Sequence, residues 1–280
     1  MVSKLTGSLL LALLLATPAF AAGPALTDYD VVLIPVFFFG GGANGSQWET
    51  NVSMASVDPN SASMPVPLFE EPFAGECGTP DGLIEENFTR AICKGYASPS
   101  GLLLYIPKSL ESRDVQFSAR IRDLSQQATS AGTEIPVVHE SEFRSSEFLL
   151  MDIPSDERFR ANLRIYGTTE TYSPEYRFIH PGGPVSMKIY DSRDLSDTLV
   201  STVINLSAPE AIAGSAYLSR PGFASIGDLV ATYPQLASVP AYTIRLQSYQ
   251  PLADPPHQWA VWAFVTITNN ETQHVTTISP

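Results

Sequence analysis

Apolar and polar residues alternate with a period of two in short segments along most of this chain. In 48–54 the even positions are apolar or small, and in 159–165 the apolar side chains fall on the odd positions. Alternation of this kind is typical of a β-strand that buries one face. The chain also holds 23 Pro and 18 Gly, which favour turns between such strands. The pattern therefore predicts an all-β protein.

One segment, 226–233, indicates a short helix. Ser225 is a suitable N-cap, Asp228 would lie in the first turn where the helix dipole favours a negative charge, and Pro234 would end the helix. Strand and helix patterns do not alternate along the chain, which argues against a doubly wound fold. Many short strands separated by turn residues favour β-sandwiches instead.

The two halves of the chain resemble each other. Segments 48–54 and 159–165 align with Asn51 opposite Asn162, and 65–70 resembles 184–191. A late strand closes each half, at 115–122 and 259–268. We therefore expect two tandem β-sandwich domains of the immunoglobulin-like type, 23–155 and 156–280. The alternative is a chance likeness between two β-rich halves.

The first residues have the layout of a secretory signal peptide, which we assign to 1–22. Lys4 provides a positive start, 9–16 is an unbroken apolar run, and Ala19-Phe20-Ala21 forms a small-x-small cleavage site. The apolar run is shorter than the roughly 20 residues that span a bilayer, so a membrane anchor is the weaker alternative. We expect a secreted, extracellular protein with no membrane span.

The net charge is −13, and loss of Lys4 with the signal peptide leaves −14. So acidic a chain argues against nucleic acid as a partner, because phosphates require a basic patch. It also disfavours docking on anionic lipid.

The chain has two cysteines, Cys77 and Cys93. In an oxidising compartment a disulfide between them is expected, worth roughly 3 kcal/mol in the chain-entropy model. Two free thiols are the alternative. Two cysteines without neighbouring histidines do not complete a zinc site.

The sequence contains no strong catalytic motif. The Gly-x-Ser-x-Gly and His-Glu-x-x-His patterns are both absent. Glu70-Glu71 and Glu85-Glu86 are adjacent pairs, and adjacent residues on a strand point to opposite faces, so neither pair suits a glycosidase. We expect a protein that is not an enzyme. A secreted hydrolase of polysaccharide or peptide is an alternative.

Two clusters are candidate binding sites. Asp191, Asp194 and Asp197 recur every third residue in a turn-like stretch, and carboxylates at such spacing can hold calcium, although acidic turns are common in a chain this acidic. We expect no other cofactor. Trp262 and Phe264 share one face of the last long strand, and with Tyr249 they could form a stacking platform for sugar rings or a partner. The alternative is that a loop or the neighbouring domain covers Trp262.

Several segments together are similar to secreted, β-sandwich-bearing proteins of environmental bacteria, most of them without an assigned activity. The segments that carry this resemblance are Ile34-Pro35-Val36, 42–51, 120–123, 132–138, 261–265 and 268–272. The resemblance implies an extracellular or cell-surface module without enzymatic activity, and it implies no functional residues.

These observations favour a non-catalytic extracellular or cell-surface protein for adhesion, matrix building or ligand binding. Its partner would be an extracellular ligand, polysaccharide or protein. A carbohydrate-binding module is the second hypothesis, and the secreted hydrolase is the third.

Overall fold

The computed structural model describes residues 29–41, 45–56, 77–78, 89–93, 97–98, 100–107, 115–125, 132–169, 183–211, 218–248 and 259–280. The predicted signal peptide, segment 65–70 and Tyr249 lie outside these residues. Within them the chain is mostly β, with one α-helix, α1 (Leu229–Thr232), and two 3-10 turns, η6 (Glu140–Glu142) and η7 (Pro234–Ser238). The all-β prediction with one short helix is therefore confirmed.

The strands are, in chain order, β1 (Tyr29–Ile34), β2 (Phe37–Gly41), β3 (Gln47–Ser56), β4 (Cys77–Gly78), β5 (Thr89–Cys93), β6 (Ala97–Ser98), β7 (Leu102–Pro107), β8 (Val115–Asp123), β9 (Thr133–Ile135), β10 (Val138–His139), β11 (Phe148–Pro154), β12 (Phe159–Thr169), β13 (Pro184–Asp191), β14 (Asp194–Asn205), β15 (Glu210–Ala211), β16 (Leu218–Arg220), β17 (Gly222–Ile226), β18 (Ala241–Ser248), β19 (Trp259–Asn269) and β20 (Val275–Ile278).

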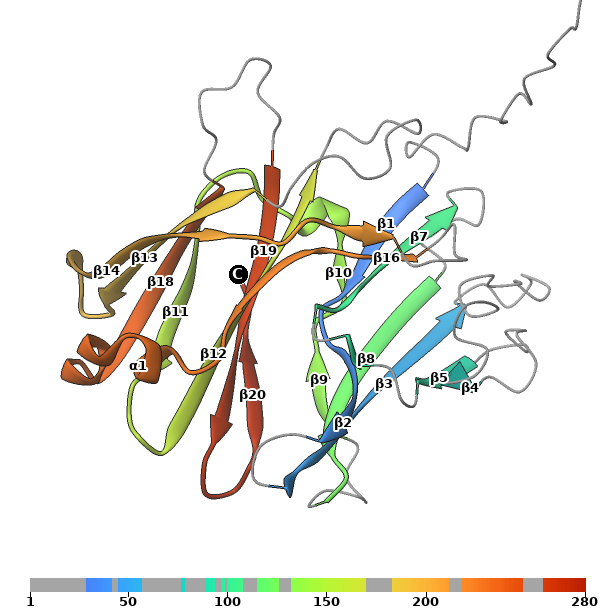
Figure 1. Ribbon diagram of the computed structural model, residues 1–280, viewed down its shortest axis with the longest axis horizontal. Coiled ribbons are helices and arrows are strands. Elements are labelled where there is room, and N and C mark those ends of the chain that lie inside the picture. The colour runs from blue at the N-terminus through green and yellow to red at the C-terminus, as the bar shows by residue number, and fades with distance from the viewer. Residues whose placement is uncertain are drawn as a thin grey trace, which may run out of the picture.

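The described strands form four antiparallel sheets. Two belong to the second half of the chain, with the orders β11-β18-β13-β14 and β17-β12-β19-β20. The third has the order β10-β1-β7-β16-β15, and the fourth is built around β3, which pairs with β2, β5 and β8, while β8 pairs with β9. Figure 1 shows β12, β19 and β20 in the middle, with β11, β18, β13 and β14 on one side and β9, β8, β2 and β3 on the other.

The predicted faces of β12 agree with the structure. Ala161, Leu163 and Ile165 point into a hydrophobic core, and the residues at 160, 162 and 164 are half-buried. This core lies between the β11-β18-β13-β14 sheet and the β17-β12-β19-β20 sheet, and β19 contributes Val261 and Val265 to it. Burial of one face on each strand is what period-two alternation predicts.

The helix is confirmed, but its N-cap differs from the predicted one. Ser225 belongs to β17, where it pairs with Arg164. The cap is Asp228, whose carboxylate accepts hydrogen bonds from the backbone N–H of Val230 (3.1 Å) and Ala231 (3.2 Å). Strand pairing extends β17 as far as Ile226, so the helix begins later than its sequence pattern suggests.

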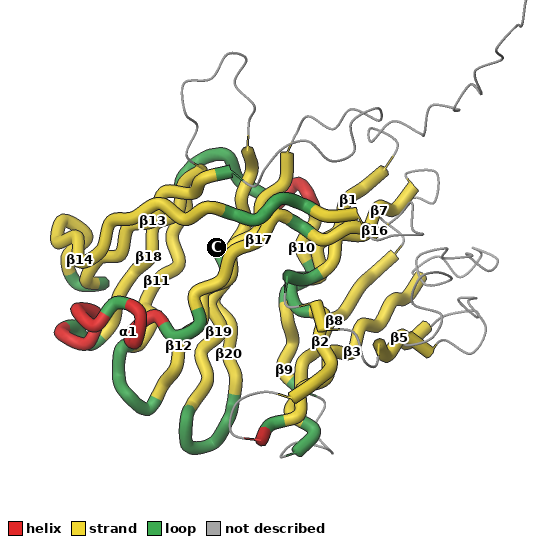
Figure 2. Tube along the Cα trace, viewed as in Figure 1, coloured by secondary structure: helices red, strands yellow, loops and turns green. Residues whose placement is uncertain are grey.

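A second core contains residues from both sides of position 155. Most of its side chains come from β1, β2, β7 and neighbouring strands, but Tyr166, Trp262 and Phe264 belong to it as well. In addition, β16 pairs with β7, with Leu218 opposite Leu104. The tube in Figure 2 shows β16 running beside β1 and β7. The division into 23–155 and 156–280 stays a prediction.

Candidate functional site

One face of β12 and β19, which we call the shared face, changes character along its length. Its cross-strand pairs run from Tyr166 opposite Trp262 and Arg164 opposite Phe264 to Asn162 opposite Thr266 and Arg160 opposite Thr268. Directly opposed residues on an antiparallel pair project to the same side of the sheet. The shared face therefore has an aromatic end, Tyr166-Trp262-Phe264, and a polar end, Arg160-Asn162-Thr266-Thr268.

The side chains of the aromatic end are buried and pack against strands of the first half of the chain. Ring centroids lie 6.0 Å apart for Tyr166 and Trp262, 5.4 Å for Trp262 and Phe264, and 5.3 Å for Tyr166 and Phe223. The Tyr166 hydroxyl donates a hydrogen bond to the backbone carbonyl of Pro35. Burial of this hydroxyl raises the pKa of Tyr166 to about 12, although nearby Arg164 partly opposes the shift. This end joins the two halves of the chain.

The polar end lines a cavity of about 300 Å³ between the two halves. Its lining residues come from β2, β3, β8 and β9 on one wall, from β12, β19 and β20 on the other, and from the residue before β2. They are Val36, Phe38, Trp48, Ile121, Ile135, Arg160, Asn162, Arg164, Thr266, Thr268 and Val275.

On β19 the side chains of the shared face become smaller toward the cavity. Tyr166, Trp262 and Phe264 fill the space between the two walls at the aromatic end, whereas Thr266 and Thr268 do not reach as far. Protein interiors are normally packed to the density of organic crystals, so a space of this size between two sheets is a departure from normal packing. At one side the walls meet, where the Thr133 hydroxyl donates to the Val275 carbonyl at 3.1 Å.

The two arginines of the cavity differ in their partners. The Arg164 guanidinium lies 5.9 Å from the centroid of the Phe223 ring, a distance at which cation–π attraction operates, and it is also hydrogen-bonded to Tyr166. Arg160 is half-buried and has neither a hydrogen bond nor an ion pair from its side chain within the described residues. The amide of Asn162 is likewise without a hydrogen-bond partner among them. Arg160 and Asn162 therefore offer the cavity polar groups that no described residue binds.

Trp48 supplies an aromatic surface on the opposite wall. Its indole N–H donates to the hydroxyl of Ser46 at 2.9 Å, so this polar group is already satisfied. The ring lines the cavity and is half-buried. The next residue on the strand, Glu49, is hydrogen-bonded to Arg122 at 3.0 Å and does not line the cavity. The face of Trp48 is thus available for apolar contact with a ligand.

Two of the three residues that were predicted to form a stacking platform are buried. Trp262 is 3% exposed and Phe264 is 0% exposed, because strands of the first half cover this part of β19. The prediction depended on an exposed face, and the alternative, that Trp262 is covered, describes its position correctly. Tyr249 lies outside the described residues.

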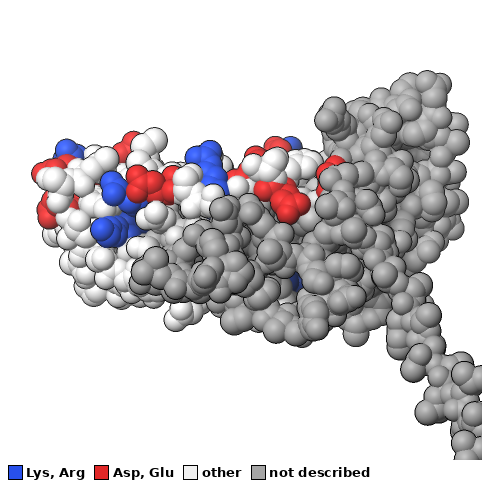
Figure 3. All heavy atoms as spheres, turned by 90° about the horizontal axis from the view of Figure 1, so that it is seen from above, with Lys and Arg blue, Asp and Glu red and all other residues white. Residues whose placement is uncertain are grey.

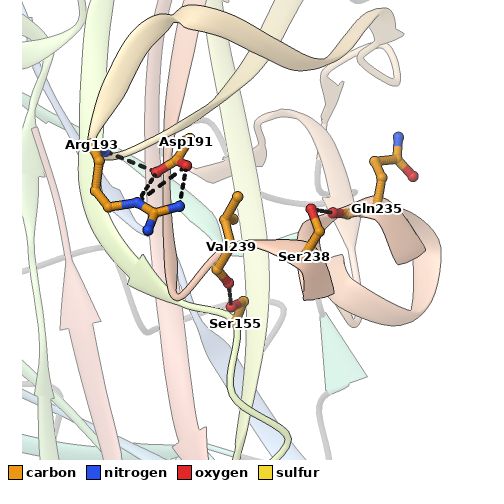
Figure 4. Close-up of polar contacts among 6 residues, drawn as sticks. All are labelled: Ser155, Asp191, Arg193, Gln235, Ser238 and Val239. Carbon is orange, nitrogen blue, oxygen red and sulfur yellow. Dashed lines mark hydrogen bonds and ion pairs between the residues drawn. The ribbon is translucent and has the colours of Figure 1, made fainter.

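The structure does not bring Asp191, Asp194 and Asp197 together as metal ligands. Figure 4 shows the Asp191 carboxylate bound by the Arg193 guanidinium, with the ion pair at 2.6 Å. Hydrogen bonds from Arg193 lower the pKa of Asp191, and hydrogen bonds from Ser196 lower that of Asp194. Asp197 lies exposed on β14. In the described part of the chain, no group of three His, Cys, Asp or Glu could hold a metal ion. Neighbouring residues bind the carboxylates of Asp191 and Asp194, and the calcium site at this turn stays a prediction.

Figure 4 also shows two hydrogen bonds made by residues between α1 and β18. The Ser155 hydroxyl donates to the Val239 carbonyl, and the Ser238 hydroxyl donates to the Gln235 carbonyl at 2.7 Å. These bonds hold the connection that follows α1.

The backbone register places Cys77 of β4 opposite Cys93 of β5. Directly opposed residues of antiparallel strands lie about 4.5–5.5 Å apart between Cα atoms, which is within the range that disulfides span. Their side chains lie outside what the structure describes, so the disulfide remains a prediction.

Two further observations concern partners. The described part of the face shown in Figure 3 has Asp and Glu beside Lys and Arg rather than a continuous basic patch. No helix within the described ranges is both long and apolar enough to cross a membrane.

Sequence reasoning missed the cavity and its free groups, Arg160 and Asn162. Their alternation assigns them to the face away from the core of the second half, and a polar residue on such a face normally meets solvent. One signal could have indicated otherwise. The run 260–265 is apolar on both faces, which is typical of a strand covered on both sides, whereas Thr266 and Thr268 restore alternation.

Comparisons with protein-family models, with curated proteins and with solved structures find no match to this chain. The cavity and its lining are therefore the basis for assigning a function.

Proposed function

We propose that this chain is an exported, non-catalytic protein of two immunoglobulin-like β-sandwiches that binds a small ligand between its sheets. The observation that carries the proposal is the cavity of about 300 Å³ at the polar end of the shared face. This volume is at the lower end of the range for small-molecule sites, which are mostly apolar with a few placed polar groups. Its apolar wall and its free Arg160 and Asn162 fit that description.

The chemistry of the lining favours binding over catalysis. The described residues around the cavity are aliphatic, aromatic, Thr, Asn and Arg, and none of them is a His, Cys, Ser, Asp or Glu. General acid–base catalysis needs a group whose pKa lies near the working pH, and arginine remains charged throughout. Arginine, asparagine and threonine are suited to hold a ligand in place.

The location of the protein is inferred from 1–22, whose charge, apolar run and cleavage site fit an export signal. The likeness between the halves supports two sandwiches, as do the two cores of the described residues. Binding of a ligand between the halves gives their contact a function beyond stability.

A direct test is to fill the cavity. Thr266→Phe places a ring in the cavity where the wild-type residue leaves space, and Ser201→Phe, on the exposed strand β14, adds the same ring elsewhere. Wild-type protein is titrated with a panel of small aromatic and aliphatic compounds and with soluble polysaccharides. Binding is followed by tryptophan fluorescence and by calorimetry.

We expect a saturable response that Ser201→Phe retains and Thr266→Phe weakens at least about tenfold, equivalent to 1.4 kcal/mol. Trp48→Phe should remove most of the fluorescence change while calorimetry still detects binding, because Trp48 is the tryptophan among the described residues that line the cavity. Equal binding by Thr266→Phe and wild type would contradict the proposal, as would a panel to which nothing binds. A response to polysaccharide alone would favour the carbohydrate-binding module.

A further inference from the structure

Arg160 differs from most other arginines of the described chain. Arg122 is paired with Glu49 at 3.0 Å, Arg158 with Asp156 at 2.9 Å, and Arg193 with Asp191 at 2.6 Å. The side chain of Arg160 has no such partner within the described ranges although it is half-buried. A guanidinium withdrawn from water loses hydration and is normally compensated by an acceptor.

The cavity is locally positive in a strongly acidic chain. The protein has 29 Asp and Glu against 16 Lys and Arg, yet the described residues that line the cavity include two arginines and no carboxylate. Arg164 is held by Phe223 and Tyr166, so its charge contributes to the field while its position is fixed. Arg160 remains as the group that can contact a ligand directly. In a partly enclosed space of low dielectric, this charge favours an anion.

The remaining lining determines what the rest of the ligand must be. Phe38, Trp48, Ile121 and Ile135 form an apolar wall opposite Arg160, with Val36 and Val275 beside them. An inorganic anion would leave this wall in contact with water. An apolar body would cover it, at roughly 25 cal/mol for each Å² removed from solvent.

We propose that the cavity takes an amphipathic carboxylate, with its carboxylate on Arg160 and its apolar body against Phe38 and Trp48. This inference rests on the proposed function and names its ligand class. The planar fork of arginine matches a carboxylate with two parallel hydrogen bonds. Asn162 lies two positions along the same face and can donate a further bond to the same group. A single free guanidinium suits a single negative charge better than the doubly charged phosphate.

The test uses pairs of ligands that differ only in charge. The first pair is 2-naphthoate and 2-naphthamide, and the others are the straight-chain carboxylates from hexanoate to dodecanoate with their amides. Each pair is titrated by calorimetry against wild type, Arg160→Gln and Lys188→Gln. Lys188 is exposed on β13 and has no side-chain partner among the described residues, so its variant removes the same charge without breaking a contact.

At least one carboxylate should bind wild type about tenfold or more tightly than its amide, as expected for a charge-assisted hydrogen bond. Arg160→Gln should abolish that preference and leave the affinity for the amide unchanged. Lys188→Gln should keep the preference. Asn162→Asp provides a second variant in case Arg160→Gln fails to fold. It keeps the side-chain size and offers Arg160 an internal counter-ion, so it should also abolish the preference.

The outcomes separate this inference from the proposed function. If amide and carboxylate bind equally and Thr266→Phe weakens both, the cavity binds ligands but the carboxylate assignment is overturned. A carboxylate preference that survives in both Arg160→Gln and Asn162→Asp places the anion elsewhere and also overturns it. If no carboxylate or amide binds at all, both the proposed ligand binding and the carboxylate assignment are wrong.

Discussion

The two ends of the shared face of β12 and β19 are built from one pair of strands in one continuous register, yet they have different properties. At the aromatic end, Tyr166, Trp262 and Phe264 are buried and fill the space to the opposite strands. At the polar end, Asn162 and Thr266 are half-buried beside a cavity. The shared face is thus in full contact with the first half of the chain at one end and borders a cavity at the other.

This difference indicates that one end of the shared face serves stability and the other serves binding. Aromatic residues contribute most when their whole surface is removed from water, which requires complete contact. A ligand site requires the reverse, a space that the protein leaves unfilled together with polar groups that it leaves unpaired. Such groups lower stability, and sites for ligands are where proteins tolerate that loss. The aromatic end therefore holds the two halves of the chain together while the polar end remains open.

The largest expected effect concerns Trp262. Trp262→Ala leaves a void between β19 and the strands of the first half and should destabilise the protein by about 3–5 kcal/mol. The matched change at the polar end, Thr266→Ala, removes few contacts and should cost no more than about 0.5 kcal/mol. Urea unfolding of both variants measures the difference. Similar values for the two would show that the ends do not differ in packing.

The next effect concerns the hydroxyl of Tyr166. Tyr166→Phe keeps the ring but leaves the Pro35 carbonyl without its donor, which should cost about 1–3 kcal/mol.

The same hydroxyl should make stability depend on alkaline pH. The folded protein raises the pKa of Tyr166 from 10.0 to about 12, so the folded state favours the neutral phenol. This contribution is fully present below pH 10 and is lost as pH rises toward about 12. Unfolding of Tyr166→Phe over the same pH range serves as the control. If it shows the same alkaline loss as wild type, Tyr166 is not the group responsible.

The smallest effect on stability is expected at Arg160. Arg160→Leu removes a half-buried charge that has no partner among the described residues, so the unfolding free energy should stay within about 0.5 kcal/mol of wild type or rise slightly. The same variant should lose the carboxylate preference of the cavity. Thermal unfolding and ligand titration of one preparation measure both. A loss of several kcal/mol would mean that Arg160 stabilises the fold through a partner, contrary to a role in binding.

Local features of the sequence predicted several parts of the molecule. The alternation in 159–165 identified which residues of β12 enter the core, and Asp228 and Pro234 marked the neighbourhood of α1. They could be predicted because strand periodicity and helix caps depend on residues close in sequence. Ser225 was wrong as the cap because pairing with β12, a distant segment, extended β17 through it.

The candidate site could not be predicted in the same way. The sequence placed Trp262 and Phe264 on one face of a strand, and it gave Arg160 and Asn162 the outward face of another. It did not say what covers either face. In the structure, strands from the first half of the chain cover Trp262 and line the cavity opposite Arg160.

The sequence by itself determined the β class, the short helix and the inward side of the main strands. Only the tertiary structure decided that Trp262 is buried, that Arg193 binds Asp191, and that a cavity lies between Arg160 and Trp48. The physical reason is that a strand's pattern states which side chains share a face, because backbone geometry fixes their direction. What lies opposite that face depends on how distant segments pack, and side-chain volume on both walls then decides whether the space is filled.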